Sequence, residues 1–156
     1  LFDDFSFVPP FVILEIVCYK FHAFDLYKLD NLAGKSDGPN EAIEEKCSPV
    51  VKRHSESSGS SKTYPTFASL LQPLLIYFDI LGTHAASSGN AAATLTILKG
   101  CTAYCAHLSE LNAKYEWSAV LWYHKDFFEK RSKEMANGIY SGWVTADHTI
   151  INKFLF

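Results

Sequence analysis

Residues Trp117 to Trp143 read WSAVLWYHKDFFEKRSKEMANGIYSGW and carry the clearest helical pattern in the chain. At about 100° per residue, the apolar side chains of this stretch fall on one broad face together with one histidine and one arginine. Asn137-Gly138 then supplies the left-handed backbone position that commonly ends a helix. We therefore predict an amphipathic helix closed by a turn, with an inward face made of Trp117, Val120, Leu121, His124, Phe127, Phe128, Arg131 and Met135.

Trp122 is the exception in this helix, because it falls among the charged residues of the opposite face. Large aromatic side chains are enriched at the contact hot spots of protein interfaces. Trp122 is therefore our first candidate for a protein interface, and Trp143, at the end of the same stretch, is the second. The alternative for Trp122 is packing under another segment of the same chain.

Further helical patterns flank this segment. Thr66 fits an N-cap, the helix after it carries apolar residues on more than one flank, and Gly82 is expected to end it. A second helix follows Asn90, and Thr145 is expected to cap a short fourth one. We predict an all-α bundle of three or four helices over residues 64–156. The expected inward stripe of the second helix is Ala91, Leu95, Leu98, Thr102 and Cys105, with Leu108 at its margin.

Two segments of different character precede the bundle. Residues 1–29 form a hydrophobic N-terminal segment; a helix from Pro10 toward Leu29 is favoured, but a buried strand fits the same residues. Residues 30–63 are rich in Gly, Pro and Ser and contain few large apolar residues, so they cannot offset their own ordering entropy. We predict a flexible linker there, with one helical turn at Glu41 to Cys47.

Composition limits the class of protein. The 156 residues suffice for one domain, and 48% hydrophobic with 15% aromatic residues fit a packed globule. A net charge of −3 argues against nucleic-acid binding through bulk charge. Asp3 and Asp4 stand where a signal peptide would carry positive charge, no apolar run is long enough for a bilayer, and four cysteines do not indicate a disulfide scaffold. We expect an intracellular protein of cytoplasm or nucleus, with no membrane contact, and, since the chain starts at Leu1, a fragment or processed product.

The residues with metal-binding or catalytic potential favour structural roles. Cys101, Cys105 and His107 have the spacing C-x3-C-x-H, but His107 lies about 200° around a helix from Cys105, so the three cannot share one tetrahedral zinc site. Two buried free thiols explain the spacing. His124 and Arg131 are expected to satisfy buried polar groups. No nucleophile, nucleotide or metalloenzyme motif is present, so we expect neither catalysis nor a metal or cofactor.

One family pattern is similar to the end of this chain. The string Trp117-x-Ala119-Val120-Leu121-x-Tyr123-His124, then Phe127-Phe128, Arg131, Glu134-Met135, Gly138, Tyr140, Gly142-Trp143 and Asp147, resembles the Gag-like helical regions of eukaryotic retroelements, including those of elements with tyrosine recombinases. The resemblance covers roughly residues 64–156. It implies a scaffolding or self-association role without catalytic positions.

The sequence departs from that pattern at its end. Proteins of this kind tend to continue into a Cys/His-rich zinc-binding segment that contacts nucleic acid, and this sequence holds none, so nucleic-acid binding is not expected through this chain alone. The alternative function is a small intracellular adaptor that binds a protein partner through the exposed aromatic surface at Trp122. The identity of a partner and the oligomeric state stay open at this stage.

Overall fold

The computed structural model describes residues 1–30 and 60–155, and every regular element in these two ranges is helical. This confirms the all-α prediction. In chain order the elements are α1 (Pro10–Val17), the 3-10 helix η1 (Ala23–Leu29), α4 (Ser60–Thr63), α5 (Phe67–Ser87), α6 (Ala91–Lys114), α7 (Trp117–Ala136), the 3-10 helix η2 (Ser141–Val144) and α8 (His148–Phe154).

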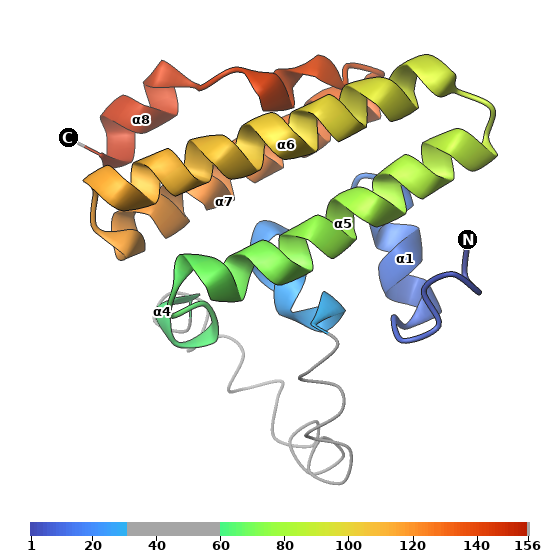
Figure 1. The fold of residues 1–156 in the computed structure, drawn as a ribbon, viewed down its shortest axis with the longest axis horizontal. Coiled ribbons are helices and arrows are strands. Elements are labelled where there is room, and N and C mark those ends of the chain that lie inside the picture. The colour runs from blue at the N-terminus through green and yellow to red at the C-terminus, as the bar shows by residue number, and fades with distance from the viewer. Residues whose placement is uncertain (31–59, 156) are drawn as a thin grey trace, which may run out of the picture.

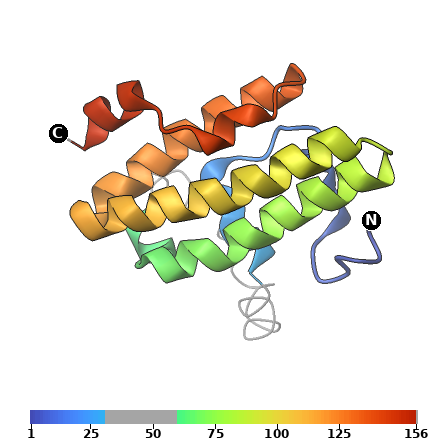
Figure 2. The same ribbon diagram turned by 45° about the horizontal axis from the view of Figure 1, so that its top comes forward.

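Three long helices make the frame. Figure 1 shows α5 and α6 running side by side in opposite directions, with α7 against α6. Figure 2 shows α6 between α5 on one side and the η2–α8 tail on the other. α1 and η1 pack on α5, and η1 also reaches α7. The N- and C-terminal ends lie at opposite ends of the molecule in Figure 1.

The start of α5 agrees with the sequence, but its end does not. The Thr66 side chain accepts a hydrogen bond from the Ser69 N–H at 3.2 Å, and the Ser69 hydroxyl accepts one from the Thr66 N–H at 3.1 Å, which is a complete capping box. The prediction that Gly82 ends this helix is wrong. Gly82 is buried within α5, which continues to Ser87, and the left-handed position that follows is Gly89, at φ 77°.

Of the later helix boundaries, the end of α7 agrees with the sequence prediction and the start of α8 does not. Gly138 adopts φ 84° directly after α7, as predicted. The cap of α8 is Asp147 and not Thr145, because the Asp147 carboxylate accepts the Ile150 N–H at 3.2 Å.

The inward face of α7 is confirmed, whereas that of α6 is wrong. All predicted residues of α7 are buried, except for Trp117, which is half-buried. On α6 the predicted stripe is instead turned outward: Leu95 and Leu98 are 54% and 56% exposed. The buried side of α6 is made of Ala93, Ile97, Gly100, Tyr104, Leu108 and Leu111.

The N-terminal segment forms part of the same core as the bundle. α1 is a helix, as favoured, but it ends at Val17, well before Leu29, and Tyr19 then adopts φ 59°. Val12, Ile13 and Leu26 have no exposed surface. Residues 1–29 therefore supply core side chains to the predicted bundle. Within the predicted linker, residues 31–59, with the expected turn at Glu41 to Cys47, lie outside the described residues.

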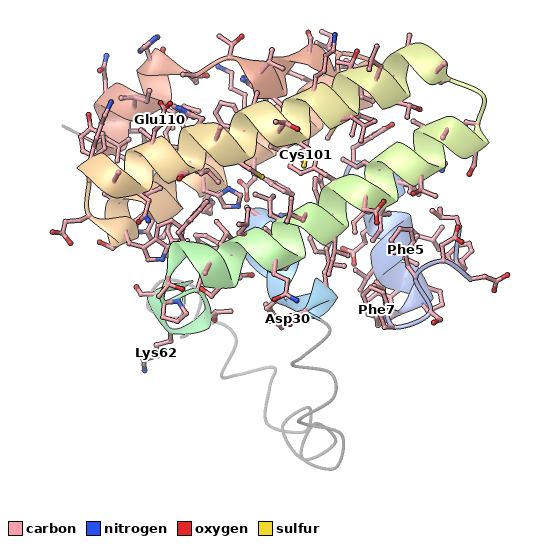
Figure 3. The ribbon with its side chains drawn as sticks, viewed as in Figure 1. Phe5, Phe7, Asp30, Lys62, Cys101 and Glu110 are labelled. Carbon is pink, nitrogen blue, oxygen red and sulfur yellow. The ribbon has the colours of Figure 1, made fainter. Side chains whose placement is uncertain are left out.

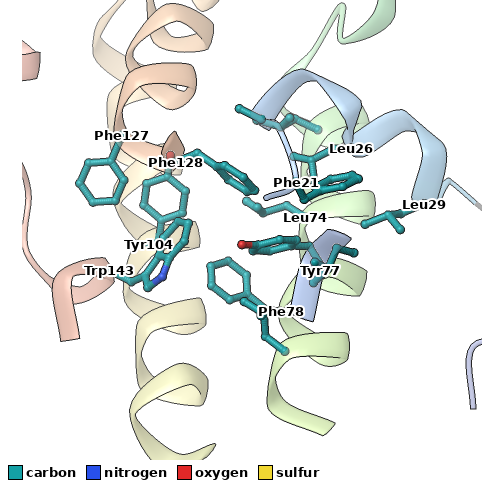
Figure 4. Close-up of a cluster of buried hydrophobic side chains, with 14 of the residues drawn as sticks. Phe21, Leu26, Leu29, Leu74, Tyr77, Phe78, Tyr104, Phe127, Phe128 and Trp143 are labelled. Atoms are coloured by element: carbon teal, nitrogen blue, oxygen red, sulfur yellow. The ribbon is translucent and has the colours of Figure 1, made fainter. Parts of the chain in front are cut away.

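Aromatic side chains fill the centre of the core, where α5, α6, α7 and η2 meet (Figure 4). The rings of Tyr104 and Phe127 stack 4.7 Å apart, and the Phe78 ring meets Trp143 edge-on at 4.8 Å. Phe128 lies 4.7 Å from Tyr77. This cluster holds the tail to the three long helices.

Candidate functional site

Neither predicted interface tryptophan is freely exposed. Trp143 is only 2% exposed, so its prediction as an interface residue is wrong. Its side chain enters the core because Gly100 of α6 leaves room for it: a β-carbon built on Gly100 would lie 2.8 Å from the Trp143 β-carbon. Trp122 is half-buried and meets the Phe24 ring edge-on at 5.7 Å. The N-terminal segment therefore contacts the surface that the sequence analysis assigned to a partner.

His124 occupies a structural position in the core. Its Nδ1 shares a hydrogen bond of 2.7 Å with the Tyr104 hydroxyl, and neither residue has exposed surface. Burial lowers the pKa of His124 to about 3, because a dry environment penalises the charged ring. The histidine is thus neutral at physiological pH and cannot be reached by a substrate.

Arg131 holds the tail to α7. Its guanidinium donates a hydrogen bond to the Gly142 carbonyl oxygen at 3.0 Å and forms ion pairs with Glu134 at 3.0 Å and Asp147 at 3.6 Å. Lys130 adds a 2.6 Å ion pair to Asp147. Burial raises the pKa of Asp147, but the hydrogen bonds from Lys130 and the Ile150 N–H, with the nearby positive charges, outweigh it and lower that pKa overall. Arg131 and its partners therefore form a structural anchor.

The two cysteines of α6 are adjacent, whereas His107 points elsewhere, as the angular argument predicts. His107 Nε2 shares a 2.9 Å hydrogen bond with the Tyr123 hydroxyl. Cys101 and Cys105 lie one turn apart on α6 and are half-buried, not fully buried as expected. Within residues 1–30 and 60–155, no three His, Cys, Asp or Glu side chains come close enough to hold a metal ion.

A groove between α5 and α6 is the candidate site that the sequence analysis missed. It has a volume of about 350 Å³. The α5 wall includes Leu75, Phe78 and Gly82, and the α6 wall includes Leu98 and Cys101. Figure 3 shows Cys101 on the side of α6 that faces α5.

Two exposed leucines, Leu75 and Leu98, line this groove, and a third, Leu95, lies one turn before Leu98 on α6. Leu75 is 45% exposed on α5, and Leu95 and Leu98 are more than half exposed on α6. Isolated exposed leucines are ordinary, but a contiguous apolar patch is a mark of an interaction site. We call the groove and these three leucines the α5/α6 surface.

Charge is scarce on the α5/α6 surface. Asp79 is the only Asp, Glu, Lys or Arg in the 21 residues of α5, whereas α7, with 20 residues, carries seven. Depletion of charge at the centre, with apolar residues in its place, is the compositional signal of a protein interface core. α7 shows the opposite composition, which suits a solvated face.

Gly82 leaves open space on the floor of the groove. A β-carbon built at this position would meet no atom within 4 Å, so no contact inside the chain requires a glycine here. Glycine in a helix interior costs about 0.5–1 kcal/mol relative to alanine. The contrast with Gly100, where Trp143 occupies the space, indicates that room at Gly82 is available to something outside the chain.

The polar groups of the groove do not form a catalytic arrangement. Asp79 is exposed and accepts a 3.5 Å hydrogen bond from Thr83 one turn later. Leu95 and Leu98 were the sequence signal for this surface, but they were assigned to the core.

No helix within the described ranges is long and apolar enough to cross a membrane. Neither a family model, nor a curated protein, nor a solved structure matches this chain.

Proposed function

We propose that this chain is a non-enzymatic helical module that self-associates through the α5/α6 surface. The observation that carries the proposal is a charge-poor groove lined by the exposed Leu75 and Leu98, with the exposed Leu95 one turn before Leu98 on α6. The polar residues with catalytic potential, His124 and Arg131, are buried in structural contacts. They do not contribute to the α5/α6 surface, which would bind a partner by burying apolar area.

A second copy of the chain fits this surface because ridge and groove lie next to each other. Leu95 and Leu98 project from α6, and the open space above Gly82 lies between α5 and α6. A two-fold axis through the surface would place the leucines of each copy over the groove of the other, which is the self-complementary geometry of an isologous dimer. With Asp79 as the only charge among the groove-lining residues, the surface carries no charge pattern that would select a different protein.

Two other surfaces support an interface less well. Trp122 is partly covered by Phe24, which weakens the adaptor alternative. The N-terminal segment exposes Phe11 and Leu14 by 60% and 50%, together with Phe2 and Phe7, but Asp3, Asp4 and Glu15 interrupt it with charge.

Self-association is also what the resemblance to Gag-like retroelement proteins implies. Membership of that group is part of our proposal and rests on the aromatic pattern between Trp117 and Asp147. An adjacent reverse transcriptase or recombinase reading frame in the genome would support it.

The test is the double variant Leu95→Glu/Leu98→Glu, with Lys99→Glu as the matched control. Lys99 is exposed and is not among the groove-lining residues. Light scattering after size-exclusion chromatography should show a concentration-dependent dimer for the parent and for Lys99→Glu. Like charges brought together cost several kcal/mol, so the double variant should weaken the dimer by more than about 100-fold.

Melting curves keep the result interpretable, since the two leucines are exposed and their replacement should leave thermal stability of the monomer nearly unchanged. A parent chain that stays monomeric at the highest soluble concentration would refute self-association. If Phe11→Glu dissolves the dimer and the double leucine variant does not, the interface lies on the N-terminal segment and the proposed surface is wrong.

A further inference from the structure

The second feature of the groove is a pair of thiols one helical turn apart. Cys101 and Cys105 lie on the same side of α6, both half-buried, and Cys101 belongs to the groove wall. With a spacing of four residues, both thiols lie on one face of the helix. Solvent therefore reaches two thiols one turn apart on one helical face.

Thiolates, rather than thiols, are the form of cysteine that binds metal ions, so both thiol protons must leave when the pair takes up an ion.

A direct disulfide does not suit this spacing. β-Carbons one turn apart on a helix are about 5–6 Å apart, whereas a disulfide needs about 3.5–4.5 Å. An ion between the sulfurs removes this mismatch. With metal–sulfur bonds of about 2.3 Å, two bonds in line separate the sulfurs by about 4.6 Å.

We propose that Cys101 and Cys105 bind one Cu(I) ion as a two-coordinate dithiolate site. Soft thiolate ligands favour Cu(I). Zinc in proteins is almost always four-coordinate, and the described residues bring no third His, Cys, Asp or Glu to this pair. His107, the one nearby candidate in the sequence, is engaged with Tyr123. The position of His107, about 200° around the helix from Cys105, excludes a shared tetrahedral site but not a two-coordinate site made by the two thiols alone.

The binding step balances without a redox change. Cu(I) keeps its oxidation state, two copper–sulfur bonds form, and the two thiol protons pass to solvent, so affinity should rise with pH. The apolar groove wall, including Leu75, Phe78 and Leu98, leaves few groups to compete as ligands. This site does not depend on self-association, because both sulfurs come from one chain.

The experiment uses the full reduced chain without oxygen, in a Cys18→Ser/Cys47→Ser background. Cys18 is exposed and distant in sequence from the pair, so its removal eliminates unrelated thiols. Cu(I) is supplied as its coloured bicinchoninate complex, and the loss of colour measures transfer. The background chain should withdraw one Cu(I), and X-ray absorption should show two sulfur neighbours.

Cys101→Ser and Cys105→Ser should each weaken binding by more than about 100-fold, since loss of a ligand exceeds the 10–100-fold effect of losing a supporting contact. Unchanged affinity in both variants, or equally tight zinc binding with four protein ligands, would overturn the proposal. Melting curves of the serine variants exclude unfolding as the cause. Repeating the titration in Leu95→Glu separates the two proposals, because Leu95 is not among the groove-lining residues and copper binding should persist when self-association is weakened.

Discussion

Two buried helix-interior glycines should respond to alanine with opposite signs. At Gly82 the new methyl group meets nothing within 4 Å, so only the gain in helix propensity remains, about 0.5–1 kcal/mol. At Gly100 the methyl group would lie 2.8 Å from the Trp143 β-carbon. That atom is attached to the backbone and cannot rotate away, so either α6 or η2 must shift.

Forced overpacking of this kind costs about 1–3 kcal/mol. Taking the middle of each range, about 2 kcal/mol less about 0.75 kcal/mol of helix propensity, Gly100→Ala should lose about 1.25 kcal/mol of unfolding free energy. For a chain of this length, 1 kcal/mol changes the melting temperature by about 2–4 °C. We therefore expect Gly100→Ala to melt about 2.5–5 °C lower than the parent and Gly82→Ala about 1–4 °C higher.

Urea unfolding followed by far-UV circular dichroism gives both free energies under one condition. A Gly100→Ala protein as stable as the parent would refute the reasoning, because it would mean that Trp143 does not pack on α6 as described. Gly82→Ala has a second measurable effect: if a partner's leucine fills the groove, the added methyl group should also weaken the dimer. Unchanged dimerisation with raised stability would show that the space at Gly82 is not used by a second copy.

Three further predictions concern the core and the tail. Phe128→Ala should lower the unfolding free energy by about 3–5 kcal/mol, because Phe128 is fully buried. Lys125 is half-buried on the other face, so Lys125→Ala should change the unfolding free energy by less than about 0.5 kcal/mol. Equal urea midpoints for the two variants would contradict the predicted inward face of α7. The pKa of His124 is about 3 in the folded chain and about 6.5 in the unfolded chain, so the unfolded chain binds more protons between these values. The free energy of unfolding should therefore fall as pH drops from about 6.5 toward 3, by up to about 1.4 kcal/mol per pH unit. His124→Gln should flatten this slope, and identical slopes for the variant and the parent would refute the assignment. Asp147→Ala removes the α8 cap and the ion pair with Lys130, so it should lower the unfolding free energy by about 1 kcal/mol or more and speed amide exchange in α8. Asp147→Asn keeps a capping oxygen, so its amides in α8 should exchange more slowly than those of Asp147→Ala. The same exchange rates in both variants would argue against capping.

The sequence predicted α7 well because its two faces differ strongly in charge. Lys125, Lys130 and Lys133 mark the outward side, so only one face of the helix could be assigned to the core. The capping box at Thr66 and the turn at Gly138 were predictable for the same reason: each depends on residues adjacent in sequence.

α6 was misread because both of its sides are apolar. Leu95 and Leu98 form one stripe and Ile97, Tyr104 and Leu108 form another, and periodicity alone cannot say which of two apolar stripes is inside. The choice depends on Trp143 and η2, which cover the second stripe after a long excursion of the chain. The stripe that stays uncovered, with Leu95 and Leu98, is the candidate interface. The second apolar side of α6 thus explains both the wrong prediction of its inward face and the presence of the proposed surface.

The position of the N-terminal segment could not be predicted either. Its contacts join residues far apart in sequence: the Tyr64 hydroxyl donates to the Phe24 carbonyl oxygen at 2.8 Å and accepts from the Tyr27 N–H at 2.8 Å. No local pattern reports such a pairing. For the same reason the cover over Trp122 was invisible, and an exposed tryptophan was expected where the chain supplies its own partner.

The three tryptophans give the protein three built-in fluorescent reporters. Trp143 is surrounded by the core, Trp122 is shielded by Phe24, and the Trp117 Nε1–H donates to the Tyr64 carbonyl oxygen at 2.7 Å. Emission shifts to longer wavelength as an indole enters water, so single-tryptophan variants would each observe a different event: opening of the core, release of the N-terminal segment, and separation of the start of α7 from the residues before α5. Agreement of the three signals during unfolding would mean that residues 1–29 and the long helices form one cooperative unit, whereas an early change at Trp122 would mean that the N-terminal segment leaves a bundle that is still folded.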